Sequence, residues 1–188
     1  MKDPFAGIAA IYDRLHWGAG RAARKILSLA DFKSTDEVLD LGGGTGRIAQ
    51  FFIGKVRRVV VADPSEAMVA ACLKKRLECL VASGDKLPFS EGVFDKVLVI
   101  DALHHIKNKN ASLGEIRRVL KVGGNLIIEE FNPDNFWGKL VVLMEKIFKF
   151  DSEFLMPGAI KNLLDDHKFI TEVYRDRRGI VYIIAKKY

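Results

Sequence analysis

The chain has 188 residues, of which 49% are apolar and 29% are charged. That length suits one domain with a sizeable core, and this composition excludes long disorder and collagen-like repeats. No run of 18 apolar residues occurs, and the first ten residues lack the basic-then-apolar order of a signal peptide, so neither a membrane span nor secretion is expected. Cys72 and Cys79 are too few for a disulfide framework, which makes a reducing cytoplasm the expected compartment.

The charge balance is mildly basic, with 30 Lys and Arg against 24 Asp and Glu and a net charge of +6. The basic residues fall in scattered pairs, such as Arg57-Arg58 and Arg177-Arg178, which is typical of solvated helix faces and turns. A nucleic-acid surface would gather them with aromatic residues on one face. We therefore rank nucleic acid below a small molecule among the candidate partners.

Short apolar runs alternate with helical patterns through the first two thirds of the chain. The runs are residues 38–41, 59–62, 80–82, 97–100 and 126–128, and the helical patterns are residues 47–53, 65–77 and 111–120. Nearly continuous apolar character is typical of parallel strands that are buried on both faces. The alternation predicts an α/β fold, a three-layer αβα sandwich with a mostly parallel sheet between helices.

The pattern changes after the turn signal at Asn132-Pro133. Apolar residues at helical spacing predict a helix over 136–148, and a second helix is expected from Pro157 to about Asp166. Residues 169–175 and 180–185 flank a turn and predict a hairpin, so the sheet should end in an antiparallel pair.

The most informative segment is the loop after the first strand, where Gly42, Gly43, Gly44 and Gly46 occupy four of five positions. Glycine is needed where φ is positive or where a ligand must approach the backbone. A tight strand-to-helix turn without a ligand would need only one glycine. At the carboxyl end of the first strand of an open α/β sheet, this loop predicts a ligand site.

The spacing of these glycines differs from that of a dinucleotide loop. Gly42, Gly44 and Gly46 give Gly-x-Gly-x-Gly, and the bulky Arg47 stands where a dinucleotide loop has its third glycine. Asp63 ends the second predicted strand, where a carboxylate can accept hydrogen bonds from both hydroxyls of a ribose. That acid indicates a nucleoside and does not by itself select the cofactor.

These residues resemble motif I of the S-adenosylmethionine-dependent methyltransferases with a Rossmann-like, seven-stranded sheet. The resemblance covers roughly residues 36 to 131, and its closest match is the small-molecule branch that includes the quinone-biosynthesis enzymes (methyltransferase type 11). The matching segments are 39–46, Asp63, 83–89, 94–106 and 115–128, with Tyr12-Asp13 near the start. The resemblance implies a single methyltransferase domain over 1–188. Its parts are a helical cover (1–33), a cofactor-binding core (34–131), a helical insertion (132–167) and a C-terminal hairpin (168–188).

The resemblance also implies the cofactor, S-adenosyl-L-methionine, and the residues around it. The glycines would meet its methionine part, and Asp40 would either fix the loop or meet the cofactor's amino group. Asp63 would meet its ribose, Asp85 its adenine, and Asp101 the departing methyl. The full implied set is Asp40, Gly42, Gly44, Gly46, Asp63, Ser65, Met68, Asp85, Lys86, Leu87 and Asp101.

Methyl transfer needs a general base only where the acceptor must lose a proton. His104 and His105 are the candidates, with Asp101 placed to orient one of them, although the pair could equally cap and pack the next helix. No His, Cys or carboxylate cluster has metal-ligand spacing, so no metal is expected.

The methyl acceptor should be a small, apolar or ring-bearing metabolite, with Tyr12, Trp17 and Phe136 as candidate substrate contacts. Two other hypotheses stay open: a Rossmann protein that binds NAD, disfavoured by Arg47 and by the lack of a substrate domain, and a cofactor-binding subunit that activates a partner without catalysis. The acceptor's identity, the atom methylated and the oligomeric state do not follow from the sequence.

Overall fold

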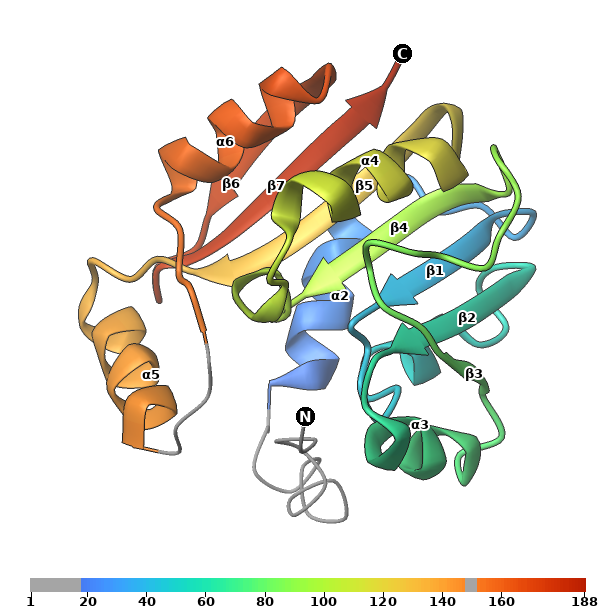
Figure 1. The fold of residues 1–188 in the computed structure, drawn as a ribbon, viewed down its shortest axis with the longest axis horizontal. Helices are drawn as coiled ribbons and strands as arrows, with labels where there is room; N and C mark the ends of the chain where they lie inside the picture. Colours follow the sequence, from blue (N-terminus) through green and yellow to red (C-terminus); the bar gives the residue numbers. More distant parts are fainter. Residues whose placement is uncertain (1–17, 148–151) are drawn as a thin grey trace.

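The computed structural model describes residues 18–147 and 152–188. Helices and 3-10 turns alternate with strands along most of the chain, as Figure 1 shows. In chain order the elements are α2 (Ala19–Leu29), β1 (Glu37–Leu41), η1 (Ala49–Phe52), β2 (Arg58–Asp63), α3 (Glu66–Leu73), β3 (Glu78–Val81), β4 (Phe94–Ile100), η2 (Leu103–His105), α4 (Lys109–Val119), β5 (Leu120–Phe131), α5 (Phe136–Ile147), α6 (Pro157–Asp166), β6 (Phe169–Arg175) and β7 (Ile180–Lys187).

The strands form one seven-stranded sheet in the order β3-β2-β1-β4-β5-β7-β6. Pairs among β1 to β5 are parallel, whereas β7 runs antiparallel to both β5 and β6. The predicted fold class is therefore confirmed: a mostly parallel sheet that ends in an antiparallel hairpin. The chain leaves β1 toward one edge of the sheet and β4 toward the other, which makes the β1–β4 junction the topological switch point.

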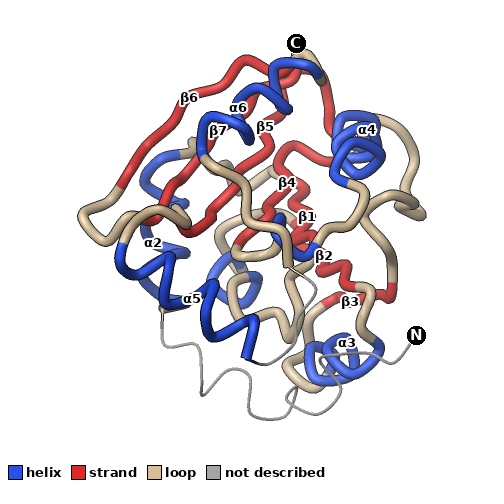
Figure 2. The backbone as a smooth tube through the Cα atoms, turned by 60° about the vertical axis from the view of Figure 1, so that its left-hand side comes forward, coloured by secondary structure: helices blue, strands red, loops and turns tan. Residues whose placement is uncertain are grey.

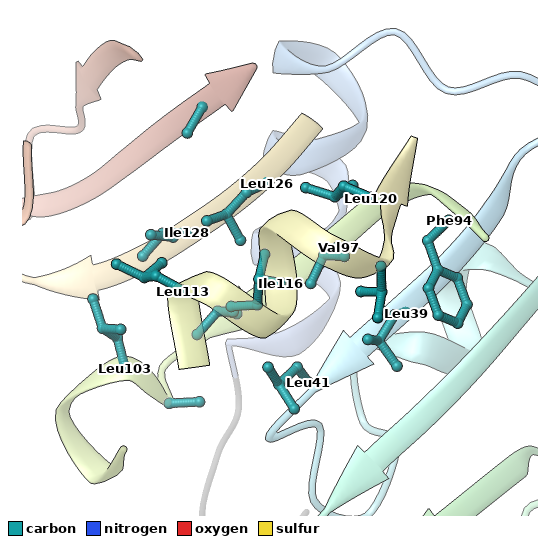
Figure 3. Packing of buried hydrophobic residues seen from close by; sticks show 14 of the residues in the cluster. Leu39, Leu41, Phe94, Val97, Leu103, Leu113, Ile116, Leu120, Leu126 and Ile128 are labelled. Carbon is teal, nitrogen blue, oxygen red and sulfur yellow. The ribbon is translucent and has the colours of Figure 1, made fainter. Parts of the chain in front are cut away.

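The core divides into two layers, one on each face of the sheet. Side chains alternate across a strand, so Val97 and Val99 face α4 and α6 while Leu98 faces α2. Figure 3 shows Leu113 and Ile116 of α4 above strand residues of the first layer. In Figure 2, α2 lies on the opposite side of the sheet from α4 and α6.

One local prediction was wrong. The helix predicted over 47–53 is a series of turns followed by the 3-10 segment η1. Gly44 and Gly46, directly before it, take positive φ values of +56° and +73° that a regular helix does not allow, so no helix continues out of the glycine loop. Gly123 and Gly124 lie inside β5. The α4 helix ends at Val119, and β5 begins at Leu120 with an irregular register opposite β4.

The two cysteines, too few for a framework, form a single disulfide between Cys72 of α3 and Cys79 of β3. Among the described residues, no helix is both long enough and apolar enough to cross a membrane.

Gly46 lies where a side chain would collide with the packing between the glycine loop and α3. A Cβ at Gly46 would lie 2.4 Å from Leu77 Cδ1 and 3.0 Å from Cys72 Sγ, whereas at Gly54, which has nearly the same φ, it would meet nothing within 4 Å. Both changes to Ala carry the strain of positive φ, and only Gly46→Ala adds the collision. We expect urea unfolding to show that Gly46→Ala costs about 1–3 kcal/mol more than Gly54→Ala. Equal losses would show that the loop accommodates the methyl group.

Candidate functional site

A cavity of about 350 Å³ opens at the carboxyl ends of β1, β2 and β4, at the topological switch point. Its wall combines the glycine loop with acidic side chains that each follow or end a strand. The lining residues used below are Asp40, Gly42, Gly43, Gly44, Arg47, Asp63, Met68, Asp85, Asp101 and His105. Open α/β sheets bind ligands at this edge.

The Asp63 carboxylate holds the glycine loop against the start of α3. Gly44 N donates to Asp63 Oδ2 at 2.9 Å, and Ser65 N donates to Oδ1 at 2.8 Å. A Cβ at Gly44 would stand within 4 Å of Met68 Sδ and Asp63 Oδ2, both on the cavity wall. The loop therefore presents bare backbone to the cavity at Gly44, beside the Asp63 carboxylate.

Asp40 lies beneath this loop and is fully buried. Burial raises the pKa of its carboxyl to about 7, because desolvation and the nearby Asp63 charge together outweigh the lowering effect of Arg47. Neither carboxylate oxygen makes a well-formed hydrogen bond with a described residue, although the backbone of Ala49 lies close enough to lower the pKa. A buried acid without well-formed hydrogen bonds is costly, and it indicates a site that a cationic group would complete.

Asp101 follows β4 with a φ of +54°, a conformation that is uncommon for a residue other than glycine. Its Oδ2 lies 3.2 Å from Arg47 Nη2, and both side chains are largely buried. These two residues also line a second cavity of about 220 Å³, beside β5 and β7. They form the boundary between the two cavities.

Glu129 of β5 lines the second cavity with Arg21, Phe131 and Tyr182. Burial and the Asp101 charge raise its pKa to about 8, although Arg47 opposes the shift. Burial raises the pKa of the Tyr182 hydroxyl, and a hydrogen bond with Glu129 raises it further. Sequence reasoning missed Glu129, although an acid just after the apolar run 126–128 follows the same pattern as Asp63 and Asp101.

The two candidate histidines lie in different surroundings. His104 is buried, with Nδ1 2.8 Å from Glu130 Oε2 and its ring stacked on Phe154. Burial disfavours its charge, but the carboxylates of Glu130 and Glu145 outweigh this effect and raise its pKa to about 10. His105 lines the cavity, and burial together with the charge on His104 lowers its pKa to about 4. The two carboxylates therefore favour the charged form of His104, whereas burial favours the neutral form of His105.

The structure brings eight sequence candidates to the main cavity: Asp40, Gly42, Gly44, Asp63, Met68, Asp85, Asp101 and His105. Other candidates support the site from outside its wall. Gly46 packs against Leu77, Ser65 caps α3 by accepting from Met68 N, and Leu87 is in the core. Lys86 and His104 do not line the cavity.

Of the expected substrate contacts, Phe136 alone lies in the described residues, and it lines neither cavity. Tyr12 and Trp17 fall outside those residues. Phe136 begins α5 and is 75% exposed.

Comparisons with known proteins agree with this geometry. The sequence profile of a family described as "Methyltransferase domain" matches residues 39–128. The UbiE ubiquinone/menaquinone biosynthesis C-methyltransferase of Pseudomonas putida is 31% identical over 195 residues, covering 93% of this chain and 74% of that protein.

Solved structures show the same fold. A chain of a Haloferax volcanii complex that contains the Trm112 methyltransferase activator has a TM-score of 0.85 at 20% identity, covering 99% of this chain and 98% of the other. An S-adenosylmethionine-dependent methyltransferase from Aquifex aeolicus has a TM-score of 0.80 at 18% identity, covering 98% of each chain.

The raised pKa of Asp40 makes stability depend on pH. A carboxyl whose pKa rises from 3.8 to about 7 on folding stabilises the fold below pH 4 and loses that contribution as pH rises through 7. We therefore expect Asp40→Asn to raise the thermal midpoint of the ligand-free protein at pH 8, by about 2–4 °C for each kcal/mol gained. The gain should shrink as pH falls toward 4.

Differential scanning calorimetry from pH 4 to pH 8 measures this difference. The exposed Asp134→Asn is the control and should follow the wild-type pH dependence. A constant offset of Asp40→Asn across that range would contradict the buried-acid interpretation.

Proposed function

This chain belongs to the family of S-adenosylmethionine-dependent methyltransferases that includes the UbiE enzymes, and we propose that it methylates a small, ring-bearing metabolite held in the second cavity. The cofactor of the family is S-adenosyl-L-methionine. The observation that carries the proposal is the bare glycine loop held by Asp63 above the buried Asp40, next to a separate, smaller cavity.

The residues of the main cavity fit the cofactor by charge and by shape. Asp40 would face the methionine ammonium, Asp63 the ribose hydroxyls, Asp85 the adenine amino group, and Met68 the adenine ring. The buried Asp40 oxygens that make no well-formed hydrogen bond with a described residue are the strongest support, because a bound cation would offset their desolvation. The bare Gly44 backbone leaves room for an aliphatic chain to pass.

The bound cofactor would supply an electrophilic methyl group on a positively charged sulfur. The chain's task is then to align the acceptor with that methyl, since correct positioning alone can contribute about 7–11 kcal/mol to the rate. Asp101 and Arg47 lie on the boundary of both cavities, where acceptor and methyl would meet. Their ion pair would hold that boundary in place.

The second cavity suits a ring with an ionisable hydroxyl or acidic carbon. Phe131 and Ile180 provide apolar walls, Arg21 provides positive charge, and Glu129 provides a buried carboxylate with a pKa near neutrality. Such a carboxylate can act as a general base. By its name, the Pseudomonas putida relative is a C-methyltransferase of ubiquinone and menaquinone biosynthesis, and this cavity supports an acceptor of related chemistry.

A partner-dependent variant of this function is favoured by one observation. The Haloferax volcanii neighbour comes from a complex with a methyltransferase activator. Sustained methyl release by the isolated chain, measured over a library of hydroxylated ring compounds, would exclude an obligatory activator.

Because S-adenosylmethionine is an intracellular metabolite, we propose that the reaction takes place in the cytoplasm.

Removing the Asp63 carboxylate tests the cofactor pose. Asp63→Ala should weaken binding of S-adenosylhomocysteine by about 10- to 100-fold, since each charge-assisted hydrogen bond contributes roughly 1.5–3 kcal/mol. Isothermal titration calorimetry measures the affinity, and circular dichroism checks that the chain remains folded. The exposed neighbour Glu66→Gln should bind as the wild type does. Unchanged affinity of Asp63→Ala for S-adenosylhomocysteine would refute the role of Asp63 in cofactor binding. Tight binding of NADH without binding of S-adenosylhomocysteine would refute it as well.

The pKa of Glu129 predicts a pH profile for methyl transfer. If Glu129 takes the acceptor's proton, kcat/KM should rise with pH until about 8 and then level off, because the carboxyl must first ionise. Glu129→Gln should lose about 10²- to 10⁴-fold in rate and should lose the rise. Glu91→Gln, an exposed change, should keep both. A profile that survives in Glu129→Gln would assign the proton transfer elsewhere, with His105 as the next candidate.

A further inference from the structure

Two histidines and one glutamate converge beside the main cavity although they come from distant segments. His104 and His105 belong to η2, which follows β4, and Glu145 lies in α5. Figure 1 places α5 on the side toward which the arrowheads of β4 and β5 point. Within residues 18–147 and 152–188, this is the single group of three ligand-type side chains whose donor atoms lie within 4.8 Å of one another.

The three donor atoms form a nearly regular triangle. The Nε2 atoms of His104 and His105 are 3.1 Å apart, and they lie 3.2 Å and 3.6 Å from Glu145 Oε1. A point slightly above the plane of this triangle can lie about 2.0–2.1 Å from all three atoms, which is the distance at which zinc binds imidazole nitrogen and carboxylate oxygen.

The outer nitrogen of each ring is already engaged by the protein. His104 Nδ1 lies 2.8 Å from Glu130 Oε2, and His105 Nδ1 lies 3.0 Å from Ser152 Oγ. Hydrogen bonds of this kind orient metal-binding histidines by fixing the ring and its tautomer. Here they direct both Nε2 atoms toward Glu145, and a bound metal would displace the proton that His104 Nε2 directs to Glu145 in the metal-free protein. The arrangement thus has an inner set of donors and an outer set of supports.

We infer that His104, His105 and Glu145 form a binding site for a divalent transition cation of the zinc class. Two imidazoles and one carboxylate on one side of an ion suit zinc or ferrous iron, whereas magnesium and calcium prefer oxygen ligands throughout. Spacing along the sequence showed no such cluster because Glu145 lies forty residues beyond the histidines; only folding brings it near.

The position of the site suggests what the ion does. His105 is a donor and also a wall residue of the main cavity, so the ion lies at the edge of that cavity. Three protein donors leave further coordination positions for water or for an oxygen of a bound molecule. The ion also ties α5 to the loop after β4.

Metal binding can be measured without any methyl transfer. The full chain, purified without a histidine tag and stripped with EDTA, is titrated with ZnCl₂ and separately with MgCl₂ by calorimetry. We expect one zinc per chain, at least 100-fold tighter than magnesium. Titration with CoCl₂ should add visible absorption bands from a cobalt ion with nitrogen and oxygen ligands.

Variants test the ligand assignment. His105→Asn and Glu145→Gln should each weaken zinc binding at least 100-fold, and Glu130→Gln should weaken it about 10- to 100-fold as an outer support. His167→Gln, a histidine that hydrogen-bonds to Asn110 away from the cluster, should bind zinc as the wild type does. Thermal unfolding of each variant without metal confirms that it is folded.

Failure of this inference is distinguishable from failure of the proposed function. Wild-type protein that takes up no stoichiometric zinc, or variants at His105 and Glu145 that bind it as tightly as the wild type, would overturn the metal site. S-adenosylhomocysteine binding by the same metal-stripped protein would at the same time leave the methyltransferase assignment intact. The reverse result, zinc binding without binding of the homocysteine compound, would support the site and count against the function.

Discussion

The carboxylate of Asp63 connects the parts on which the cavity depends. Four glycines in five positions give the loop after β1 a large conformational freedom, and such a loop does not hold one shape by itself. Asp63 restricts it by accepting from Gly44 N on one side and Ser65 N on the other. Its own place is set by the pairing of β2 with β1 and β3. One side chain thereby links the sheet, the bare backbone and the start of α3.

The same edge of the sheet concentrates negative charge. Asp63 ends β2, Asp101 follows β4, and Asp40 and Glu129 lie within the last three residues of β1 and β5. Burial raises the pKa of Asp40 and of Glu129. Arg47 lies among them and pairs with Asp101. Burying Asp40 and Glu129 lowers the stability of the ligand-free protein, and a cationic ligand would recover part of that loss. This balance between stability and binding is typical of functional sites.

Several elements could be predicted from the sequence with accuracy. The helix from Pro157 to Asp166 and the hairpin around Gly179 lie where local signals placed them, because proline, glycine and a period of two or 3.6 act over a few residues. The segment after the glycine loop was predicted poorly. There, apolar residues at helical spacing form turns and the 3-10 segment η1, directly after Gly46 with its positive φ.

The sequence by itself determined the fold class, the loop and the acids at the strand ends, because the carboxyl ends of parallel strands must meet at one edge of a sheet. Tertiary structure alone decided which distant groups touch. Arg47 and Asp101, which form an ion pair, are 54 positions apart in the sequence. Glu129 of β5 hydrogen-bonds with Tyr182 of β7. Glu145, on the separate helix α5, lies close to the two histidines. Such contacts depend on how helices and the hairpin pack against the sheet. That packing is set by the shape of two core layers, which no local spacing encodes.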